Sequence, residues 1–376
     1  MNNKVKLLSI CKPKQYKTIS KNELVENGKY LVYGANGVIG KSNKYTHENP
    51  TLMVTCRGAT CGSLNISKPF SYINGNAMAF DSIDKNFDLM YLYYYLSSRG
   101  FKDAISGTAQ PQITRENLKN IDVLDLSLEK QKQIAKTLDK ANELIELRKE
   151  SITKLDALAK SIFIDMFGDP VSNPRGWEIK KLKELSTHIL SGNTPKGGSQ
   201  VYVDKGIHFF RSQNVWKNRI VLDDIAYIDN ETHLKMKKSS LKYKDILITK
   251  TGRINTENSS LGRASLFLGE DNSANINGHV YLIRLKKSLV HEFVLYILTT
   301  DEYREYIRSV CVGAIDKRQI NKAHLEEFPI IFPDIELQKK FSLIANKIEE
   351  QKSLYEKELE KLEENFQALL QKSFQE

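Results

Sequence analysis

One stretch of this sequence has the residue types of a phosphate-binding loop. Ala35-Asn-Gly-Val-Ile-Gly-Lys-Ser42 matches the loosened form of a P-loop, with Ala in place of the first Gly. Such a loop needs a strand before it and a helix after it, because the N-terminus of that helix holds the phosphates. Leu31–Tyr33 could be the strand, but Asn43–Pro50 is rich in Asn and ends in Pro, so it makes a poor helix. The better interpretation is a Gly- and Asn-rich turn that displays polar groups.

The residue spacings of other catalytic sites are incomplete. An adenine methyltransferase would have an Asn/Asp-Pro-Pro-aromatic motif, whereas Asn173-Pro174 is followed by Arg175. Pro333-Asp334 does not continue into the Glu-x-Lys of a nuclease, and the seven histidines form no HxH or HxxxH pair. No Ser/His/Asp or Cys/His arrangement stands out. No complete catalytic motif or metal-ligand spacing is therefore visible in the sequence, and a site that side chains form only in the folded chain stays open.

Composition points to a polyanionic partner. The 376 residues suit two or three domains, and the formal net charge of +10 favours nucleic acid or an anionic membrane. No apolar run approaches the ~20 residues of a spanning helix, and Met1–Ile10 lacks a signal-type apolar stretch. The four scattered cysteines have no zinc spacing and are interpreted as reduced. We expect a cytoplasmic protein that binds nucleic acid and no membrane.

The chain is a long-range internal repeat. Gln112-Ile113 falls on Gln319-Ile320 at an offset of 207 residues, and Gln131 falls on Gln338 at the same offset. Each matched stretch continues into a heptad pattern, and Leu128–Phe167 contains no Pro or Gly. Those 40 residues at ~1.5 Å each would make a rod of about 60 Å. Two equal helices in one chain favour pairing with each other over a generic dimerisation coiled coil.

The predicted seams of these helices are mostly apolar. Arg148 and Lys352 stand near the middle of the two seams, where they would break the seam or extend out of it. The first seam contains Ile134, Leu138, Ile145, Ile152, Leu155 and Ile162. The second contains Phe341, Ile348, Tyr355, Leu359, Leu362, Phe366 and Leu369.

The two globular halves are predicted to be α/β (α+β). Short β-type runs are Tyr30–Tyr33, Leu52–Thr55, Ile207–Phe210, Ile246–Thr249 and Val280–Leu285, and helices are expected at Phe87–Ser97 and Val290–Ile307. We predict a first globular domain over 1–126, a first helix over 127–167, a linker over 168–176, a second globular domain over 177–333 and a second helix over 334–376. The two helices together have a net charge of −2, so the rest of the chain carries +12.

The order of these segments resembles the specificity subunits of type I restriction-modification enzymes. The stretches that carry the resemblance are Tyr33–Gly40, Pro50–Gly62, Phe167–Pro170, Gly192–Pro195 and the twin Gln-Ile…Glu-x-Gln segments. The resemblance implies two target-recognition domains, each reading one half of a split DNA site, and an antiparallel coiled coil that fixes the gap. The weak match between the two halves indicates different half-sites, and hence an asymmetric target.

The resemblance also implies the partners. Two methyltransferase subunits would bind the helices and bring S-adenosylmethionine, and restriction subunits would add ATP- and magnesium-dependent translocation and cleavage of double-stranded DNA. The specificity subunit itself would be non-catalytic and would hold no metal or cofactor of its own.

Candidate DNA contacts are polar and basic residues in Gly-rich turns, because Arg, Lys, Asn and Gln can reach base edges or phosphates. In the first half these are Asn36, Lys41, Arg57, Gln110 and Gln112. In the second half they are Lys196, Arg211, Gln213, Asn214, Lys250, Arg253, Lys317 and Arg318. Gln112 and Gln319 have an alternative role as hinges between globular domain and helix.

Two other functions stay open at this point. A P-loop nucleotide-binding enzyme would lose its nucleotide on Lys41→Ala. A coiled-coil scaffold without sequence preference would bind DNA with an affinity that depends on salt alone.

Overall fold

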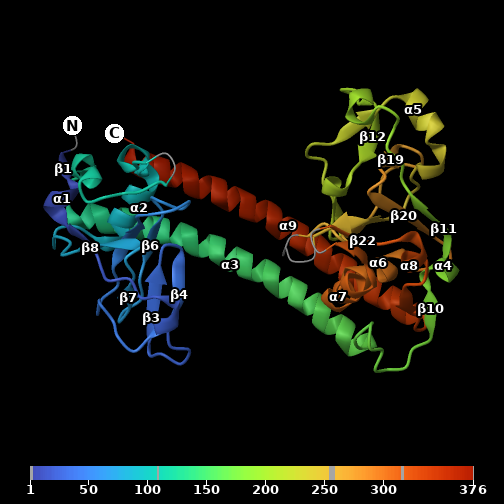
Figure 1. Ribbon diagram of the computed structural model, residues 1–376, viewed down its shortest axis with the longest axis horizontal. Coiled ribbons are helices and arrows are strands. Elements are labelled where there is room, and N and C mark those ends of the chain that lie inside the picture. Colours follow the sequence, from blue (N-terminus) through green and yellow to red (C-terminus); the bar gives the residue numbers. More distant parts are fainter. Residues whose placement is uncertain (1–2, 108–109, 254–258, 315–316, 376) are drawn as a thin grey trace. The chain divides into compact units, whose positions relative to one another are not determined.

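The computed structural model describes residues 3–107, 110–253, 259–314 and 317–375 (Figure 1). The chain divides into two compact units. Unit 1 comprises Met1–Ser151 and Tyr355–Glu376, and unit 2 comprises Ile152–Leu354. The long helices α3 (Leu128–Phe167) and α9 (Ile335–Phe374) each contribute one part to each unit. Both helices begin and end within two residues of the predicted ranges.

Unit 1 contains two main sheets. A four-stranded antiparallel sheet has the order β2-β8-β5-β6, and a three-stranded sheet has the order β4-β3-β7, with β3 and β7 parallel. Helix α2 covers the first sheet with buried tyrosines and leucines. The strands are β1 Lys4–Lys6, β2 Lys12–Gln15, β3 Tyr30–Gly34, β4 Gly37–Ser42, β5 Leu52–Thr55, β6 Leu64–Ile66, β7 Tyr72–Ile73, β8 Ala77–Asp81 and β9 Asp122–Leu124, and the shorter helices are α1 Leu7–Ile10 and α2 Leu89–Arg99.

Unit 2 repeats this arrangement. Its four-stranded sheet is β11-β20-β16-β18, and its three-stranded sheet is β15-β12-β19, again with one parallel pair. The strands are β10 Ile179–Lys181, β11 Ser186–Ser191, β12 Ile207–Phe210, β13 Val215–Trp216, β14 Arg219–Ile220, β15 Ala226–Ile228, β16 Ile246–Thr249, β17 Thr251–Gly252, β18 Ala264–Leu266, β19 Ala274–Ile276, β20 Val280–Leu285, β21 Val312–Ala314, β22 Lys317–Gln319 and β23 Pro329–Ile331. The helices are α4 Leu182–Leu185, α5 Asn230–Lys235, α6 His291–Thr299, α7 Asp301–Val310 and α8 Lys322–Glu326.

A buried glutamine near the start of each long helix occupies the same place in both repeats. The Gln131 amide nitrogen donates to the Leu126 carbonyl at 2.8 Å, and the Gln338 amide nitrogen donates to the Pro333 carbonyl at 2.8 Å. Gln131 also accepts from the backbone N–H of Asp88 and donates to the Asn86 carbonyl. Both glutamines are essentially unexposed. Because a buried amide must be hydrogen-bonded, each glutamine ties the start of its helix to the preceding segment.

In unit 1 the first part of α3 packs antiparallel on the last part of α9. Leu138 shares a buried cluster with Leu370 and with Tyr94 of α2. Near the middle of the seam, the Arg148 guanidinium lies 4.0 Å from the Tyr355 ring and pairs with Glu358 at 2.8 Å. Arg148 therefore extends out of the apolar seam toward a carboxylate, one of the two alternatives for this residue.

One seam residue was predicted in the wrong position. Leu369 is 37% exposed, whereas its neighbour Leu370 is buried. A strict heptad repeats every 3.5 residues, and a straight helix repeats every 3.6, so the buried face drifts along α9. The last turn then packs on α2 as well as on α3 and follows the helical repeat.

In unit 2 the last part of α3 packs on the first part of α9. The ring of Phe163 lies 5.2 Å from the Phe341 ring, and both are fully buried in the main core of the unit. Lys352 donates to Asp156 on α3 at 2.6 Å, so the second basic seam residue also reaches a carboxylate on the facing helix.

Most predicted elements of the globular halves are confirmed. Four of the five predicted β-runs coincide with strands, and the fifth is one residue longer. The single helix expected over Val290–Ile307 is wrong, because it is two helices separated by Thr300. Thr300 adopts an extended conformation, and its side chain accepts from the Tyr303 backbone N–H, which starts a new helix.

The P-loop hypothesis fails on local structure. Gly37–Ser42 is strand β4, paired in a hairpin with β3, and no helix follows it. Without a helix N-terminus, the backbone offers no phosphate cradle of that kind. The turn at Ala35–Asn36 fits the alternative of a polar Gly- and Asn-rich turn.

We expect Gln131→Leu to destabilise unit 1 by roughly 3 kcal/mol, because two backbone carbonyls and one backbone N–H lose their buried partner. Urea unfolding of the full chain would measure this loss. Gln133→Leu, on an exposed position of the same helix, is the matched control. Equal unfolding midpoints for the two variants would contradict the structural role of Gln131.

Candidate nucleic-acid interface

Four loops come together at one edge of the four-stranded sheet in each unit. In unit 1 we call them loop cluster 1, which consists of Lys17–Ser20, Cys56–Ala59, Asn74–Asn76 and Gln110–Gln112. In unit 2 the equivalent loops are loop cluster 2, which consists of Asn193–Lys196, Lys250–Arg253, Asn277–His279 and Lys317–Gln319.

The two clusters are held by the same backbone contacts. Ile113 N–H donates to the Cys56 carbonyl at 3.0 Å, and Ile320 N–H donates to the Lys250 carbonyl at 2.9 Å. Arg57 pairs with Gln112 across a β-bridge, as Thr251 pairs with Gln319 in unit 2. Residues that align in the sequence repeat therefore also occupy equivalent positions in the two units.

The other two loops of each cluster approach one another closely. Asn74 accepts from the Ile19 backbone N–H at 3.0 Å, and its neighbour Gly75 lies against the Tyr16 carbonyl, where a Cβ would stand at 2.6 Å. In unit 2, a Cβ on Gly192 would collide with the carbonyls of Ile276 and Asn277. Glycine at these two positions permits the close approach of the loops.

Most predicted DNA contacts of the first half lie on loop cluster 1. Arg57, Gln110 and Gln112 are exposed members of the cluster. Asn36, also exposed, accepts a hydrogen bond from Thr60 in the loop that follows Cys56. Lys41 lies apart, because it is five residues along β4, which at ~3.4 Å per residue is about 17 Å from Asn36.

In the second half, five predicted residues belong to loop cluster 2. Lys196, Arg253 and Lys317 are exposed. Lys250 is half-buried, with its ammonium 5.5 Å from the Tyr281 ring, and Arg318 donates to the Cys311 carbonyl at 3.0 Å. Gln112 and Gln319 lie within the clusters and not at the starts of the long helices, so the hinge role is not supported.

The remaining three predicted residues form a local network beside loop cluster 2. Asn214 is fully buried, accepts from the Arg211 backbone N–H and donates to the carbonyls of Val221 and Asp223. Both ends of the Asn214 amide are hydrogen-bonded within the protein, so this side chain is not available for the predicted DNA contact. Arg211 is half-buried and pairs with Asp224 at 3.2 Å. Gln213 is exposed and donates to the same carboxylate.

Several members of the clusters were missed. Lys17, Asn76 and His279 are exposed in these loops, yet they were not chosen as candidates. Asn76 and His279 occupy the same position of the repeat, where their carbonyls accept from the N–H groups of Cys56 and Lys250. The aligned Tyr72–Asn76 and Asn275–His279 stretches contained the signal needed to find this pair.

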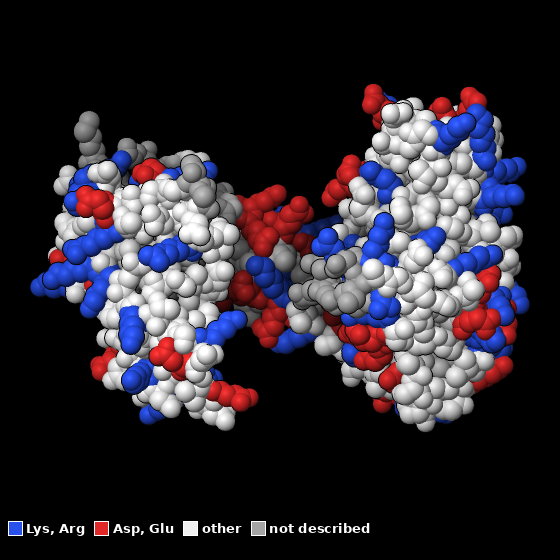
Figure 2. Space-filling model, viewed as in Figure 1, with Lys and Arg blue, Asp and Glu red and all other residues white. Residues whose placement is uncertain are grey.

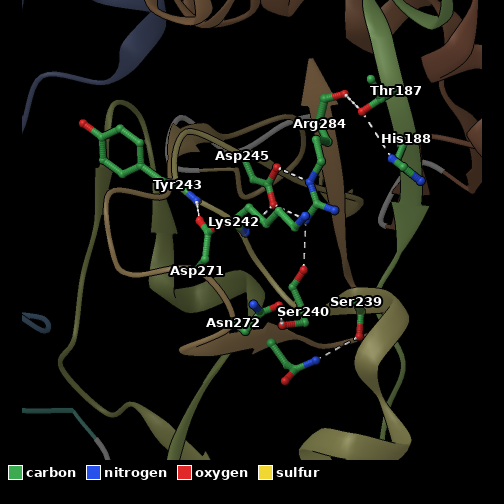
Figure 3. Close-up of polar contacts among 11 residues, drawn as sticks. Thr187, His188, Ser239, Ser240, Lys242, Tyr243, Asp245, Asp271, Asn272 and Arg284 are labelled. Carbon is green, nitrogen blue, oxygen red and sulfur yellow. Dashed lines mark hydrogen bonds and ion pairs between the residues drawn. The ribbon is translucent and has the colours of Figure 1, made fainter. Parts of the chain in front are cut away.

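A buried ion pair fixes the strand that leads into loop cluster 2 (Figure 3). Asp245, just before β16, is 1% exposed and receives two hydrogen bonds from Arg284 of β20, at 2.8 and 2.7 Å. Arg284 also donates to the Ser240 carbonyl at 3.0 Å. Such a bidentate pair holds β16 and β20 in one register, and β16 continues directly into Lys250.

Unit 1 has the opposite charge at the equivalent strand position. Asp81 of β8 stands where Arg284 stands in β20, and it receives hydrogen bonds from Tyr16 at 2.6 Å and His47 at 2.9 Å. Burial and the bond to Asp81 raise the pKa of Tyr16 to about 12, which favours the protonated hydroxyl that donates to this carboxylate. The two repeats therefore fix the same strand position, at the end of the sheet opposite the loop clusters, with different chemistry.

A half-buried arginine lies behind loop cluster 2. The Arg263 guanidinium stacks 3.8 Å from the Trp216 ring centroid, and its Nε donates to the Ser259 carbonyl. Burial and the neighbouring charge of Arg304 lower the pKa of Arg263. An arginine stays charged in spite of such a shift, so this region of unit 2 remains positive.

Charge is distributed as the sequence indicated. Figure 2 shows Lys and Arg spread over both globular parts, and Asp and Glu together with Lys and Arg on the visible stretch of the long helices. Among the described residues, none of the helices combines the length and the apolar character needed to cross a bilayer.

Comparison with known proteins identifies the family of this chain. The sequence profile described as the type I restriction modification DNA specificity domain matches residues 2–157 and 174–364. The chain belongs to this specificity family. The two matched stretches fall on the two repeats, so the resemblance noted from the sequence motifs is confirmed. Specificity subunits of this family recognise DNA for type I restriction-modification enzymes, and that is the function of this chain.

Individual relatives are distant but cover the chain well. The type I restriction enzyme MjaVIII specificity subunit of Methanocaldococcus jannaschii is 23% identical over 352 residues, which is 88% of this chain and 81% of that protein. The solved S subunit of a type I restriction-modification system from M. genitalium has a TM-score of 0.64 at 18% identity, covering 100% of this chain and 96% of that chain.

A second solved structure is a chain from work on complex assembly and conformational transition of the type I restriction-modification system. It has a TM-score of 0.55 at 17% identity, covering 99% of this chain and 97% of that chain. These similarities confirm the predicted fold of two repeated globular domains, each followed by a long helix.

We expect Asp245→Ala to destabilise unit 2 by about 3 to 5 kcal/mol, because Arg284 would keep its charge without a buried partner. Thermal or urea unfolding would measure the effect, and Asp204→Ala at an exposed position is the control. A double variant, Asp245→Leu with Arg284→Met, should recover most of the loss. If Asp245→Ala unfolds like the wild type, the ion pair does not fix the strands.

Proposed function

We propose that this specificity subunit reads a bipartite, asymmetric DNA site, with loop cluster 1 contacting one half-site and loop cluster 2 the other. The observation that carries the proposal is the duplication of one loop cluster at one register, with different residues at equivalent positions. Equivalent scaffolds favour equivalent docking on the duplex, and different side chains favour different bases.

The candidate contacts are the exposed polar side chains of the clusters and their flanks. They comprise Asn36, Arg57, Gln110, Gln112, Lys196, Gln213, Arg253 and Lys317, together with Lys17, Asn76 and His279, and with Lys250, Arg318 and Arg211 half-buried beside them. Lys41 is a candidate for a separate phosphate contact at the far end of β4. Arg and Lys pair with phosphates or guanine, whereas Asn and Gln suit adenine.

The partners follow from membership of the family. We propose that two methyltransferase subunits bind the paired helices and that restriction subunits join the assembly. S-adenosylmethionine, ATP and magnesium would then be held by those subunits, while this chain supplies recognition without catalysis in the cytoplasm. The two helices together carry a net charge of −2, so they lack the positive charge that attracts the DNA backbone and are better suited to protein contacts.

Genome-wide mapping of adenine methylation, in host cells with and without this gene, tests the proposal. We expect deletion to remove one split, asymmetric motif and to leave every other methylated motif in place. Restoring the gene on a plasmid should restore the same motif. An unchanged methylome, in cells that express the chain together with a methyltransferase subunit, would contradict the proposal.

We expect the helices to determine the gap between half-sites. One heptad inserted after Ser151 in α3 and one after Leu354 in α9 would fall between the Arg148–Tyr355 and Asp156–Lys352 contacts. Seven residues add about 10 Å at ~1.5 Å each, or roughly three base pairs at ~3.4 Å. Methylome mapping should then report unchanged half-sites with a wider gap, and a change in either half-site would refute this role.

A further inference from the structure

The equivalence of the two loop clusters allows their chemistry to be compared position by position. Both globular halves have the same formal charge of +6, from 16 Lys and Arg against 10 Asp and Glu in 1–126, and 24 against 18 in 177–333. A difference in charge between the clusters therefore reflects the positions of the cations within each half and not the total charge of the half.

Cations are concentrated in loop cluster 2. At five equivalent positions it has a cation where loop cluster 1 has none: Lys196 for Ser20, Lys250 for Cys56, Arg253 for Ala59, Lys317 for Gln110 and Arg318 for Pro111. The reverse holds at two positions, with Lys17 for Asn193 and Arg57 for Thr251.

Loop cluster 1 has uncharged hydrogen-bonding groups instead. Gln110, Gln112 and Asn76 are exposed there, and Asn36 lies beside them through its bond with Thr60. An amide can pair with a base edge as a donor and an acceptor, but it displaces no counterion from a phosphate.

We infer that the two clusters hold DNA by different means, an inference that rests on the proposed function. Loop cluster 2 anchors the phosphate backbone through its cations and supplies most of the salt-dependent affinity. Loop cluster 1 contacts its half-site mainly through amides and supplies sequence discrimination with little salt dependence.

The exposed positions of the clusters provide a matched test. The cation variant is Arg253→Gln with Lys317→Gln, and the amide variant is Gln110→Ala with Gln112→Ala, which changes the position equivalent to Lys317. Lys237→Gln with Lys238→Gln, exposed on unit 2 and not part of loop cluster 2, removes the same charge and is the control. All four side chains in the first two variants are exposed, and an unchanged thermal midpoint would show that each variant folds.

Binding is measured with the full chain in complex with its methyltransferase subunit, on a random-sequence duplex and on a duplex carrying the mapped motif. The slope of log Kd against log salt should become shallower by about 1.8 in the cation variant, from two contacts at ~0.9 each. The amide variant should keep the wild-type slope and lose about tenfold or more of its discrimination at one half-site. The control should change neither quantity.

Two results would overturn the inference. In the first, the cation variant keeps the wild-type slope of log Kd against log salt. In the second, the slope of the amide variant becomes as shallow as that of the cation variant. The proposed function fails separately, if the wild-type complex binds both duplexes equally. In that case the salt slopes measured on the random-sequence duplex still show whether the cations of loop cluster 2 contact phosphates.

Discussion

The packing of α3 on α9 is the interaction on which both units depend, because neither unit is completed by its own stretch of globular chain. Unit 1 includes the last part of α9, where Leu370 is buried against Tyr94, and Phe374 lies against Tyr91 and Tyr95. Unit 2 includes the last part of α3, where Phe163 and Phe167 are fully buried in its main core. Each loop cluster is thus built on a core that both helices help to form, and burial of these aromatic rings provides much of its driving force.

The helix seam also contains one basic residue in each unit. Arg148 and Lys352 interrupt the apolar pattern, and each reaches a carboxylate on the facing helix. Such half-exposed pairs add little stability, but they favour one axial alignment of the helices over others. A register error of one turn would separate Arg148 from both Tyr355 and Glu358. The seam therefore specifies the alignment, while the aromatic contacts at its ends supply the stability.

The sequence was sufficient for the repeat, the two long helices and five of the strands, because those follow from periodicity and from an ungapped offset of 207 residues. It was insufficient where tertiary packing competes with local pattern. Leu369 fits the heptad, yet Leu370 is buried because α2 also contacts that turn. Asn214 looked like a base-reading amide, but its bonds to Val221 and Asp223 lie across a loop that no local motif predicts. The partner of Asp245 is 39 residues away in the sequence, so no local sequence pattern predicts this ion pair.

The inverted charges at Asp81 and Arg284 have a consequence for how genes of this kind can exchange segments. A crossover that joined part of the first globular half to part of the second would place Asp81 beside Asp245, or Arg284 beside His47, and would leave a buried charge unpaired. A crossover within the long helices would keep each strand with its own loops. It would also leave intact the equivalent hydrogen bonds that Gln131 and Gln338 make at the starts of the two helices. Selection for stability alone would then concentrate viable recombination junctions in the helices, and new DNA targets would arise by inheritance of whole globular halves.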